Sequence, residues 1–517
     1  MLAQILKCPP SPLWRLRKAL ERPGDAQRSL LLMLVRRAKD TAWGRAHGYS
    51  DLLCSPLPQL VAEYQSRVPL SNYNDLQPYL ERVRGGESDV LWPGRPVAFA
   101  VSGGTRSGGR AIPLSRETLK FLTRSSLLPG LTYLAEKPGA TAMLWGKFLS
   151  LPGGIETGTF GGKPAGEVSG LLASHAPRVL SSWLQALPRR IMLMENWDAK
   201  LTESARLAVR QDVRAIAMVP SWAPVFFERV RQVVGTATIV DAIKKVWPNL
   251  QVFFSGGVAL SSYRPVLESY FGPDVDFIES YSASEGLFAF QDRSDQEGMV
   301  VNLNSGVFFE FVPTSEGNSE KPARHTLDTV ETGVDYILYV TNTGGLWSLC
   351  VEDIVRFVSV RPPRLFVMGR VGEMLDRFGD ATSADHARQA LAATDKASGT
   401  MSLNHHLTYT DPTASLPPRH RWVIEFESMP VDLDAYARTL DDFMQQFNGR
   451  YRTRREPGAM AAPMVTPVPT GSFEGYLRSV RKRLSGQSKI VGVSEDGGIA
   501  RGIIAAAREI DDSNTVC

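Results

Sequence analysis

The sequence predicts an α/β protein with a large N-terminal domain and a smaller α+β domain at the C-terminus, and three observations predict this fold class. Apolar, strand-like runs alternate with helical patterns through the first half of the chain, and Gly- or Ser-rich turns follow the strands, which is typical of a mostly parallel sheet. From residue 298 to 370 the pattern changes to short strands separated by tight turns, which indicates an antiparallel subdomain. Past Gly372 the sequence becomes polar and rich in Ala, Thr and Ser.

This shift in composition sets the expected domain boundary near residue 376. We therefore expect one domain over residues 1–376 and a second over residues 377–517. The tail from residue 493 ends in an Ala-rich helical pattern and is expected to be loosely packed.

The overall composition excludes several classes of protein. The 517 residues are 43% hydrophobic and 22% charged, as in a folded globular protein, and 58 basic residues against 54 acidic ones give no general signal of nucleic-acid binding. The four cysteines contain no Cys-x-x-Cys pair, which argues against a zinc or redox motif and fits a reducing compartment. No apolar run approaches the ~20 residues of a membrane span, and the N-terminus lacks a signal-peptide pattern, so we expect a cytoplasmic protein.

Hydrophobic periodicity gives the expected elements in chain order. Helices are expected over residues 13–46 with a break at Pro23-Gly24, over 58–83 in short pieces, and over 117–136, 166–189 and 433–447. Strands are expected at 96–101, 140–151, 213–219, 250–254, 277–281, 307–312, 336–341, 354–360, 365–368 and 421–426. The pair His405-His406 falls in a polar stretch and is expected in an exposed loop.

The stretch Ser102-Gly-Gly-Thr-Arg-Ser-Gly-Gly109 is the first candidate site. It lies between the strand ending at Val101 and a helix expected from Arg116, for which Ser115 is a suitable N-cap. Glycines let the backbone approach a ligand, and hydroxyls with successive N–H groups can bind phosphate, whereas the alternative is a flexible Gly/Ser turn. A Walker loop and a dinucleotide fingerprint are excluded, because neither Gly-Lys-Ser/Thr nor the Gly-x-Gly-x-x-Gly spacing is present.

Two later strands are followed by similar turns, Ser255–Gly257 and Ser282–Gly286. Ligands in parallel sheets bind beyond the carboxyl ends of the strands. The three turns are therefore expected to contribute to one site.

Nine segments along the chain can be compared with known motifs: Asp40–Gly48, Val68–Asp75, Pro78–Arg82, Ser102–Thr105, Ser255–Gly257, Tyr281–Glu285, Phe308–Pro313, Gly345–Asp353 and Gly486–Lys489. Taken together, they resemble the plant auxin-responsive acyl-acid amido synthetase family, a branch of the adenylate-forming superfamily, over residues 27–492. The resemblance implies a large adenylate-forming N-terminal domain that binds ATP and the acyl substrate, and a smaller, mobile C-terminal lid domain.

The resemblance also implies roles for individual residues with ATP and Mg²⁺. The nucleotide would be bound by Ser102, Gly104, Thr105, Ser107 and Gly108 at the phosphates, Gly256 and Gly257 under the adenine, Tyr281 and Ser282 beside it, and Asp353 and Arg370 near the ribose. Glu285 would coordinate Mg²⁺, which prefers carboxylate and phosphate oxygens. Lys489 would neutralise charge between the substrate carboxylate and the α-phosphate, and Arg106 and Arg110 could add charge at the phosphates.

The sequence departs from the family pattern at two places. Where the family commonly has Tyr-Arg-x-Gly-Asp, this chain has Leu349-Cys-Val-Glu-Asp353, so that Cys350 and Glu352 replace an arginine and a glycine. Ala381 and Ala384 stand where relatives tend to carry a lysine and a glutamate. The departure at residues 349–353 points either to altered substrate chemistry or to a weakened or lost nucleotide site, and no role is assigned to Ala381 or Ala384.

The implied activity is the ATP-dependent adenylation of a small carboxylic acid, followed by transfer of the acyl group to an amine, with an amino acid as the expected acceptor. Two alternatives remain open: coenzyme A or a carrier thiol as the acceptor, and a non-catalytic homologue that binds a ligand or partner. The acyl pocket is expected near the helix at 117–136, the loop at 152–163 and Ser221-Trp222, but the sequence does not specify the acid.

Overall fold

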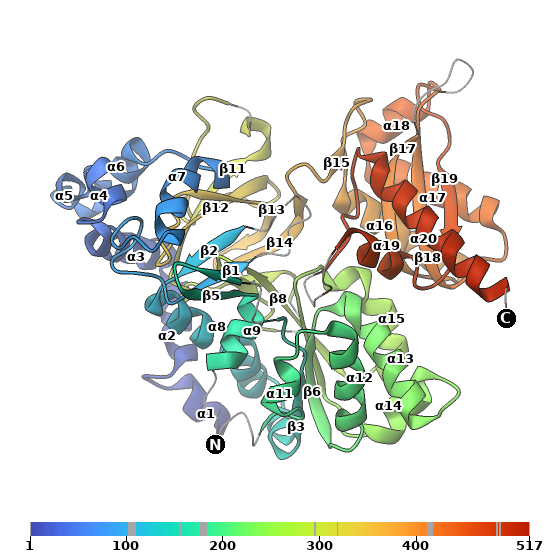
Figure 1. Ribbon diagram of the computed structural model, residues 1–517. Coiled ribbons are helices and arrows are strands. Elements are labelled where there is room, and N and C mark those ends of the chain that lie inside the picture. Colours follow the sequence, from blue (N-terminus) through green and yellow to red (C-terminus); the bar gives the residue numbers. More distant parts are fainter. Residues whose placement is uncertain are drawn as a thin grey trace. The chain divides into compact units, whose positions relative to one another are not determined.

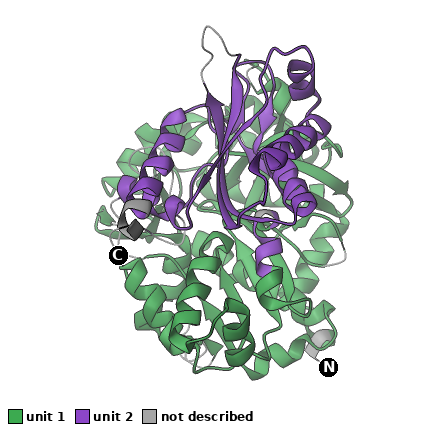
Figure 2. Cartoon of the chain, turned by 90° about the vertical axis from the view of Figure 1, so that its right-hand side faces the viewer, with its two compact units in different colours: residues 1–260, 268–367, 485–487 green, residues 261–267, 368–484, 488–517 purple. Residues whose placement is uncertain are grey.

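The computed structural model describes residues 2–101, 110–154, 158–175, 184–293, 296–317, 319–410, 417–481, 484 and 488–515 (Figure 1). The chain divides into two compact units (Figure 2). Residues 1–260, 268–367 and 485–487 belong to the first unit, and residues 261–267, 368–484 and 488–517 belong to the second.

A ten-stranded sheet is the centre of the first unit, with the strand order β11-β12-β13-β14-β10-β9-β8-β7-β6-β3. Its strands are β3 (Lys147–Ser150), β6 (Val213–Met218), β7 (Val252–Gly256), β8 (Asp276–Ala283), β9 (Gly286–Phe290), β10 (Met299–Val301), β11 (Val307–Pro313), β12 (Asp335–Asn342), β13 (Leu349–Val360) and β14 (Pro363–Arg370). Strands β3, β6, β7 and β8 pair in parallel, and antiparallel pairing begins where β8 turns back into β9. The predicted α/β class is confirmed, and its parallel and antiparallel parts share one continuous sheet.

Helices connect the parallel strands, as the alternating pattern predicts. Helices α12 (Trp197–Ala208), α13 (Ala223–Val234) and α14 (Ile239–Val246) lie side by side (Figure 1). Asn196 caps the start of helix α12, because its side-chain oxygen accepts a hydrogen bond from the Ala199 amide at 2.9 Å. Gly235 caps the end of helix α13, with a φ of 72° that glycine reaches without strain.

The long helix α8 (Arg116–Glu136) begins as the sequence predicts. The Ser115 hydroxyl accepts a hydrogen bond from the Thr118 amide at 3.0 Å, which confirms Ser115 as the N-cap. Strand β2 (Ala111–Leu114), which precedes this helix, pairs antiparallel with β1 (Ala98–Val101).

The N-terminal segment packs around a second, four-stranded sheet with the order β2-β1-β5-β4. Its other strands are β4 (Gly158–Phe160) and β5 (Lys163–Gly166). The remaining helices up to residue 316 are α1 (Leu2–Lys7), α2 (Pro12–Glu21), α3 (Pro23–Ala38), α4 (Ala42–Ala46), α5 (Tyr49–Leu52), η1 (Leu57–Gln59), α6 (Leu60–Arg67), α7 (Tyr73–Arg84), η2 (Ala140–Trp145), α9 (Val168–His175), α11 (Arg189–Met192), η3 (Pro220–Trp222), η4 (Leu260–Ser262), α15 (Arg264–Phe271) and η5 (Thr314–Glu316). The predicted break at Pro23 is confirmed, because α2 ends at Glu21 and α3 begins at Pro23.

The strand expected over residues 140–151 is wrong in its first half. Residues 140–145 form the 3-10 helix η2, and only Lys147–Ser150 form a strand. An apolar run does not by itself distinguish a strand from a short helix. Here Gly139, with a φ of 82°, turns the chain into η2, and Trp145 at its end is 82% exposed.

Among its described residues from 368 onward, the second unit contains the two-stranded sheet β15-β16, the three-stranded sheet β17-β18-β19 and five helices. The elements are β15 (Met374–Leu375), β16 (Thr382–Ser383), α16 (Ala384–Ser398), β17 (Met401–Thr410), β18 (Arg419–Ser428), α17 (Leu433–Phe447), α18 (Gly449–Arg455), β19 (Met464–Val468), α19 (Ser472–Val480) and α20 (Gly497–Thr515). Helix α17 has the predicted bounds.

Two expectations for the second unit are corrected. His405 and His406 lie in strand β17, not in an exposed loop, and His406 is fully buried. The tail expected to be loose carries α20, which buries Ala500 and Ile503 against Val423 and Phe473. Small side chains allow this close packing, since they cover apolar surface without holding the helices apart.

Candidate active site

Strand β8 brings the first predicted site residues to the end of the parallel part of the sheet. Tyr281 is almost fully buried, and its ring meets the ring of Phe288 edge-on at 5.1 Å. Its hydroxyl donates a hydrogen bond to the Asp353 carboxylate at 2.7 Å. Two residues that the sequence predicts in one site, 72 positions apart, are therefore in direct contact.

The Tyr281–Asp353 contact requires a curved sheet. Tyr281 lies on β8 and Asp353 on β13, and β9, β10 and β14 separate these two strands in the sheet order. In a flat sheet the two strands would lie about 19 Å apart, from four spacings of ~4.8 Å. The sheet is therefore curved between β8 and β13, and this curvature brings the two residues into contact.

The turn after β7 is close to the backbone of β8. Gly256 pairs with Ser280, and a Cβ atom on Gly256 would lie 3.2 Å from the Ser280 carbonyl oxygen. Gly257 has a φ of 87°, which favours glycine. Both glycines are thus explained by local geometry, and both leave the edge of the sheet without a side chain where an adenine is expected.

Glu285 lies in the turn between β8 and β9 and is almost fully buried. Its backbone carbonyl accepts a hydrogen bond from the Asn342 side-chain amide at 2.8 Å, and the Asn342 side-chain oxygen accepts one from the Gly344 amide at 2.8 Å. Asn342 therefore fixes the turn that carries Glu285. Sequence reasoning missed this residue, although the motif Asn342-Thr-Gly-Gly345 marks a turn there.

The described residues contain no group of three or more His, Cys, Asp or Glu side chains that could by themselves hold a metal ion. A single carboxylate such as Glu285 fits Mg²⁺ only when phosphate oxygens complete the coordination, which is the usual arrangement for a nucleotide-bound magnesium ion.

Glu352 pairs with Arg110 in an ion pair that the sequence reading did not anticipate. The role of Arg110 at the phosphates stays a prediction, and in the structure its guanidinium contacts the Glu352 carboxylate. Glu352 has a φ of 68°, in the left-handed region that favours glycine, so the family's glycine at this position has a conformational explanation.

Several predicted site residues are not brought together with this cluster by the described structure. Ser102, Gly104, Thr105, Ser107 and Gly108 lie outside the described residues; the chain on either side of them is joined by the pairing of Val101 with Ala111. Arg370 ends strand β14, and Lys489 follows the last undescribed stretch before α20; both belong to the second unit.

Two regions expected to line the acyl pocket both contact helix α12, one of them through a buried lysine. Lys200 on α12 donates a hydrogen bond to the Pro152 carbonyl, and burial lowers the pKa of its amine to about 8. The ring of Trp197 lies 5.3 Å from the ring of Trp222. The loop after β3 and the start of α13 are therefore linked through α12.

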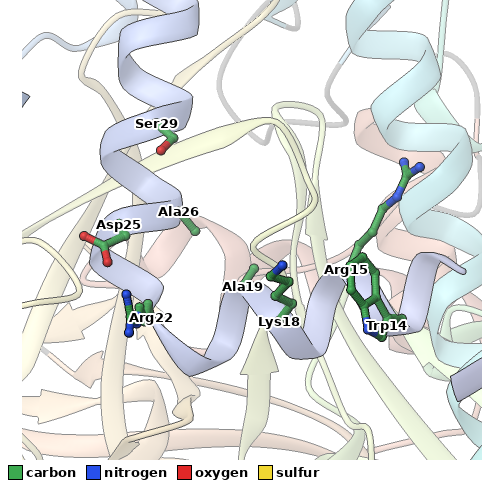
Figure 3. Close-up of a pocket in the computed structure, with 8 residues that line it drawn as sticks. All are labelled: Trp14, Arg15, Lys18, Ala19, Arg22, Asp25, Ala26 and Ser29. Atoms are coloured by element: carbon green, nitrogen blue, oxygen red, sulfur yellow. The ribbon is translucent and has the colours of Figure 1, made fainter. Parts of the chain in front are cut away.

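A surface groove lies elsewhere on the first unit, between α2 and α3 (Figure 3). It has a volume of about 330 Å³ and is lined by Trp14, Arg15, Lys18, Ala19, Arg22, Asp25, Ala26 and Ser29. None of the predicted site residues lines it.

Comparison with known proteins gives one family along the chain. Residues 13–200 and 165–275 match the GH3 family N-terminal domain, residues 300–370 the GH3 family central domain, and residues 385–497 the GH3 family C-terminal domain. Indole-3-acetic acid-amido synthetase GH3.8 of Oryza sativa subsp. indica is 25% identical over 492 residues, which cover 80% of each chain. Indole-3-acetic acid-amido synthetase GH3.3 of Arabidopsis thaliana is 23% identical, again over 80% of each chain.

Solved structures show the same fold. AtGH3.15 acyl acid amido synthetase in complex with 2,4-DB superposes with a TM-score of 0.76 and 18% identity, over 96% of this chain and 95% of that one. 2-Hydroxyisobutyryl-CoA ligase in its postadenylation state superposes with a TM-score of 0.57 and 14% identity, over 94% and 92% of the two chains. Among the described residues, no helix combines the length and apolar character needed to cross a membrane.

Proposed function

The chain belongs to the GH3 family, and on that premise we propose that it is an ATP-dependent ligase that adenylates a small carboxylic acid and transfers the acyl group to an amine, with an amino acid as the acceptor. Relatives in the family are named amido synthetases. The single observation that carries the proposal is the Tyr281–Asp353 hydrogen bond, because it places an aromatic ring and a carboxylate together beside the Gly256–Gly257 turn.

A carboxylate is a poor acyl donor, because its oxygen is a poor leaving group. In the first step the carboxylate oxygen attacks the α-phosphorus of ATP, and pyrophosphate leaves. In the second step the amine nitrogen attacks the acyl carbon, loses a proton, and AMP leaves. Positioning and charge stabilisation supply most of the rate enhancement in such reactions.

The proposed roles follow the contacts in the first unit. Asp353 would accept hydrogen bonds from the ribose hydroxyls, with Tyr281 and Ser282 beside the adenine and Gly256 and Gly257 under it. The fixed turn that carries Glu285 supports a role in binding Mg²⁺, which would screen the charge of the phosphates. The stretch 102–109 would bind the phosphates through Ser102, Gly104, Thr105, Ser107 and Gly108.

The proposal also assigns roles to the two parts of the chain. Residues 1–376 would bind ATP and the acid, and residues 377–517 would act as a lid that supplies Lys489, with Arg370 near the ribose.

Cys8, Cys54 and Cys350 are free thiols, which supports a cytoplasmic location.

The test is ATP–pyrophosphate exchange that depends on an added carboxylic acid, with Mg²⁺ and a panel of aryl, indolyl, fatty and amino acids. Exchange with one class of acid would support adenylation, and an acceptor screen of amino acids against coenzyme A would then separate the amide ligase from a thioester ligase. Lys489→Ala should lower the exchange rate about 10²- to 10³-fold, the usual cost of removing a group that stabilises transition-state charge.

Lys396→Ala is the matched control, because Lys396 is an exposed lysine on α16 of the same unit. Unchanged exchange in the Lys489→Ala variant would remove the role given to Lys489. No exchange with any acid, together with no binding of ATP by calorimetry, would overturn the proposed function.

A further inference from the structure

Strand β13 contains an irregularity at the position of Asp353. Ile337 on β12 pairs with Ile354, but Tyr339 pairs with Cys350. One residue of β12 therefore stands opposite three residues of β13, which are 351–353. Such a bulge disrupts the ladder locally and redirects the side chains that it contains.

Glu352 is the central residue of this bulge, and its backbone is strained. Its φ of 68° is in the left-handed region, which side-chain-bearing residues other than Asn and Asp seldom occupy. Strained backbone of this kind persists only where the surrounding contacts hold it, and it is found more often at functional sites. One contact that can hold it is the ion pair between the Glu352 carboxylate and the Arg110 guanidinium.

Arg110 is anchored independently of Glu352. Its guanidinium lies over the ring of Tyr73, 5.5 Å from the ring centre. The next residue, Ala111, donates its amide hydrogen to the Tyr73 hydroxyl at 3.0 Å and pairs with Val101 across β1 and β2. Glu352 is thus tied to a residue at the end of the four-stranded sheet, 242 positions away in the sequence.

We propose that Arg110 and Glu352 form a positioning pair that holds the β13 bulge, so that Asp353 is kept at hydrogen-bonding distance from Tyr281 and ready for the ribose of a nucleotide. The part concerning the nucleotide rests on the proposed function. Arg110 and Glu352 act through Asp353, so they are positioning residues and not catalytic ones. Glu352, which stands where the family has a glycine, lacks the conformational freedom of glycine, but its side chain makes the ion pair that fixes the bulge.

The test uses the full-length protein and three variants, Glu352→Gly, Arg110→Gln and the charge exchange R110E/E352R. Calorimetric ATP affinity is measured without any acid, and hydrogen–deuterium exchange of the segment 349–356 is measured without nucleotide. Each single variant should bind ATP about fivefold more weakly, which is the upper range for a partly exposed ion pair, and should exchange faster in the bulge. The double variant R110E/E352R should recover at least half of the lost ATP affinity and should reverse at least half of the increase in the hydrogen–deuterium exchange rate.

Melting temperature separates positioning from a general loss of stability. Glycine is relaxed at a positive φ, so Glu352→Gly should melt within about 2 °C of the wild type, or higher, although its ATP affinity falls. Asp335→Asn is the matched control. Asp335 on β12 forms an ion pair with Arg356, which lies on β13 as Glu352 does, and the Asp335 side chain is 33% exposed, against 34% for Glu352. This control should leave ATP affinity unchanged.

Wild-type ATP affinity and wild-type exchange rates in Glu352→Gly and Arg110→Gln would overturn the proposal. If wild-type protein fails to bind ATP, the proposed function is wrong and the nucleotide part of the inference falls with it. In that case faster exchange in both single variants, reversed in R110E/E352R, would still support the pair as the contact that holds the bulge.

Discussion

Two tyrosine–aspartate hydrogen bonds, one in each unit, use the same chemistry in different surroundings. In the first unit Tyr281 donates to Asp353, which remains partly exposed. In the second unit Tyr409 donates to Asp380, which is 0% exposed. Each aspartate also has a neighbour with positive φ, Glu352 at 68° and Ala381 at 42°, so unusual backbone alone does not distinguish the two sites.

The partners of the two carboxylates do distinguish them. Asp380 also accepts hydrogen bonds from the His420 ring at 2.8 Å and from the Thr382 hydroxyl at 2.7 Å. Burial alone would raise the pKa of Asp380, but the interactions with His420, together with the hydrogen bonds from Tyr409 and Thr382, outweigh burial and lower the pKa. A buried carboxylate enclosed by donors from its own chain holds structure together, whereas a partly exposed one remains accessible to a ligand.

Removing the buried carboxylate should have the largest effect on stability. Asp380→Ala leaves Tyr409 and His420 buried without their acceptor, so the free energy of unfolding should fall by about 3–5 kcal/mol, the cost of breaking a buried pair. Urea denaturation measures this effect, and Asp380→Asn should lose less because the amide oxygen still accepts. If Asp353→Ala destabilises the protein as much as Asp380→Ala does, the structural contrast between the two aspartates is wrong.

Removing the partly exposed carboxylate should affect nucleotide binding and spare stability. Asp353→Ala should raise the KM for ATP about 10- to 100-fold, from the loss of charged hydrogen bonds to the ribose. Tyr281→Phe removes only the hydroxyl donor and should have a smaller effect. Steady-state adenylation at varied ATP concentration tests both variants, and an unaltered KM in Asp353→Ala would remove the ribose assignment.

The sequence predicted several of the elements and residues in this comparison, but it did not predict the long-range contacts between them. Periodicity located α17 and the strands β7 and β8, and the motifs selected Tyr281 and Asp353 before their contact was known. Periodicity reports which face of an element is buried, but not which distant element lies against it. The pairing of Arg110 with Glu352 and the enclosure of Asp380 depend on such long-range contacts, so neither could be derived from spacing.

The prediction for the short stretch around His405 and His406 is wrong for a related reason. His405 and His406 were expected in a loop because their stretch is polar, but β17 buries one face and pairs with β18 along its length. The local polarity of a strand is a weak guide when the tertiary structure supplies hydrogen-bond partners, as the Val491 carbonyl does for the His406 ring at 2.7 Å.

These histidines should make the second unit sensitive to acid. Burial lowers the pKa of His405 to about 4, with smaller contributions from His406 and Arg388, and burial also lowers the pKa of His406. An unfolded histidine has a pKa of about 6.5, so the unfolded chain binds protons first as the pH falls. The stabilisation is therefore present above pH ~6.5 and lost between pH ~6.5 and ~4.

Unfolding free energy at pH 5 should be about 1–2 kcal/mol below its value at pH 7, by this linkage. Chemical denaturation at the two pH values measures the difference, and His405→Gln should reduce it. His175→Gln is the control, because His175 is an exposed histidine of the first unit. An identical pH dependence in wild type and His405→Gln would exclude His405 as the source.

The smallest effect is expected from Cys350, which lies on β13 beside the first cluster. Burial raises the pKa of its thiol, so the group stays neutral at pH 7. Its backbone amide helps to anchor the strand by donating a hydrogen bond to the Ser71 carbonyl at 2.7 Å. Cys350→Ser keeps that amide and a side chain of similar size, so stability should change by less than about 0.5 kcal/mol and the KM for ATP should stay within twofold. A tenfold rise in KM would mean that the nucleotide cluster extends along β13 past Glu352, and that the replacement of the family's arginine at residue 350 alters the site directly.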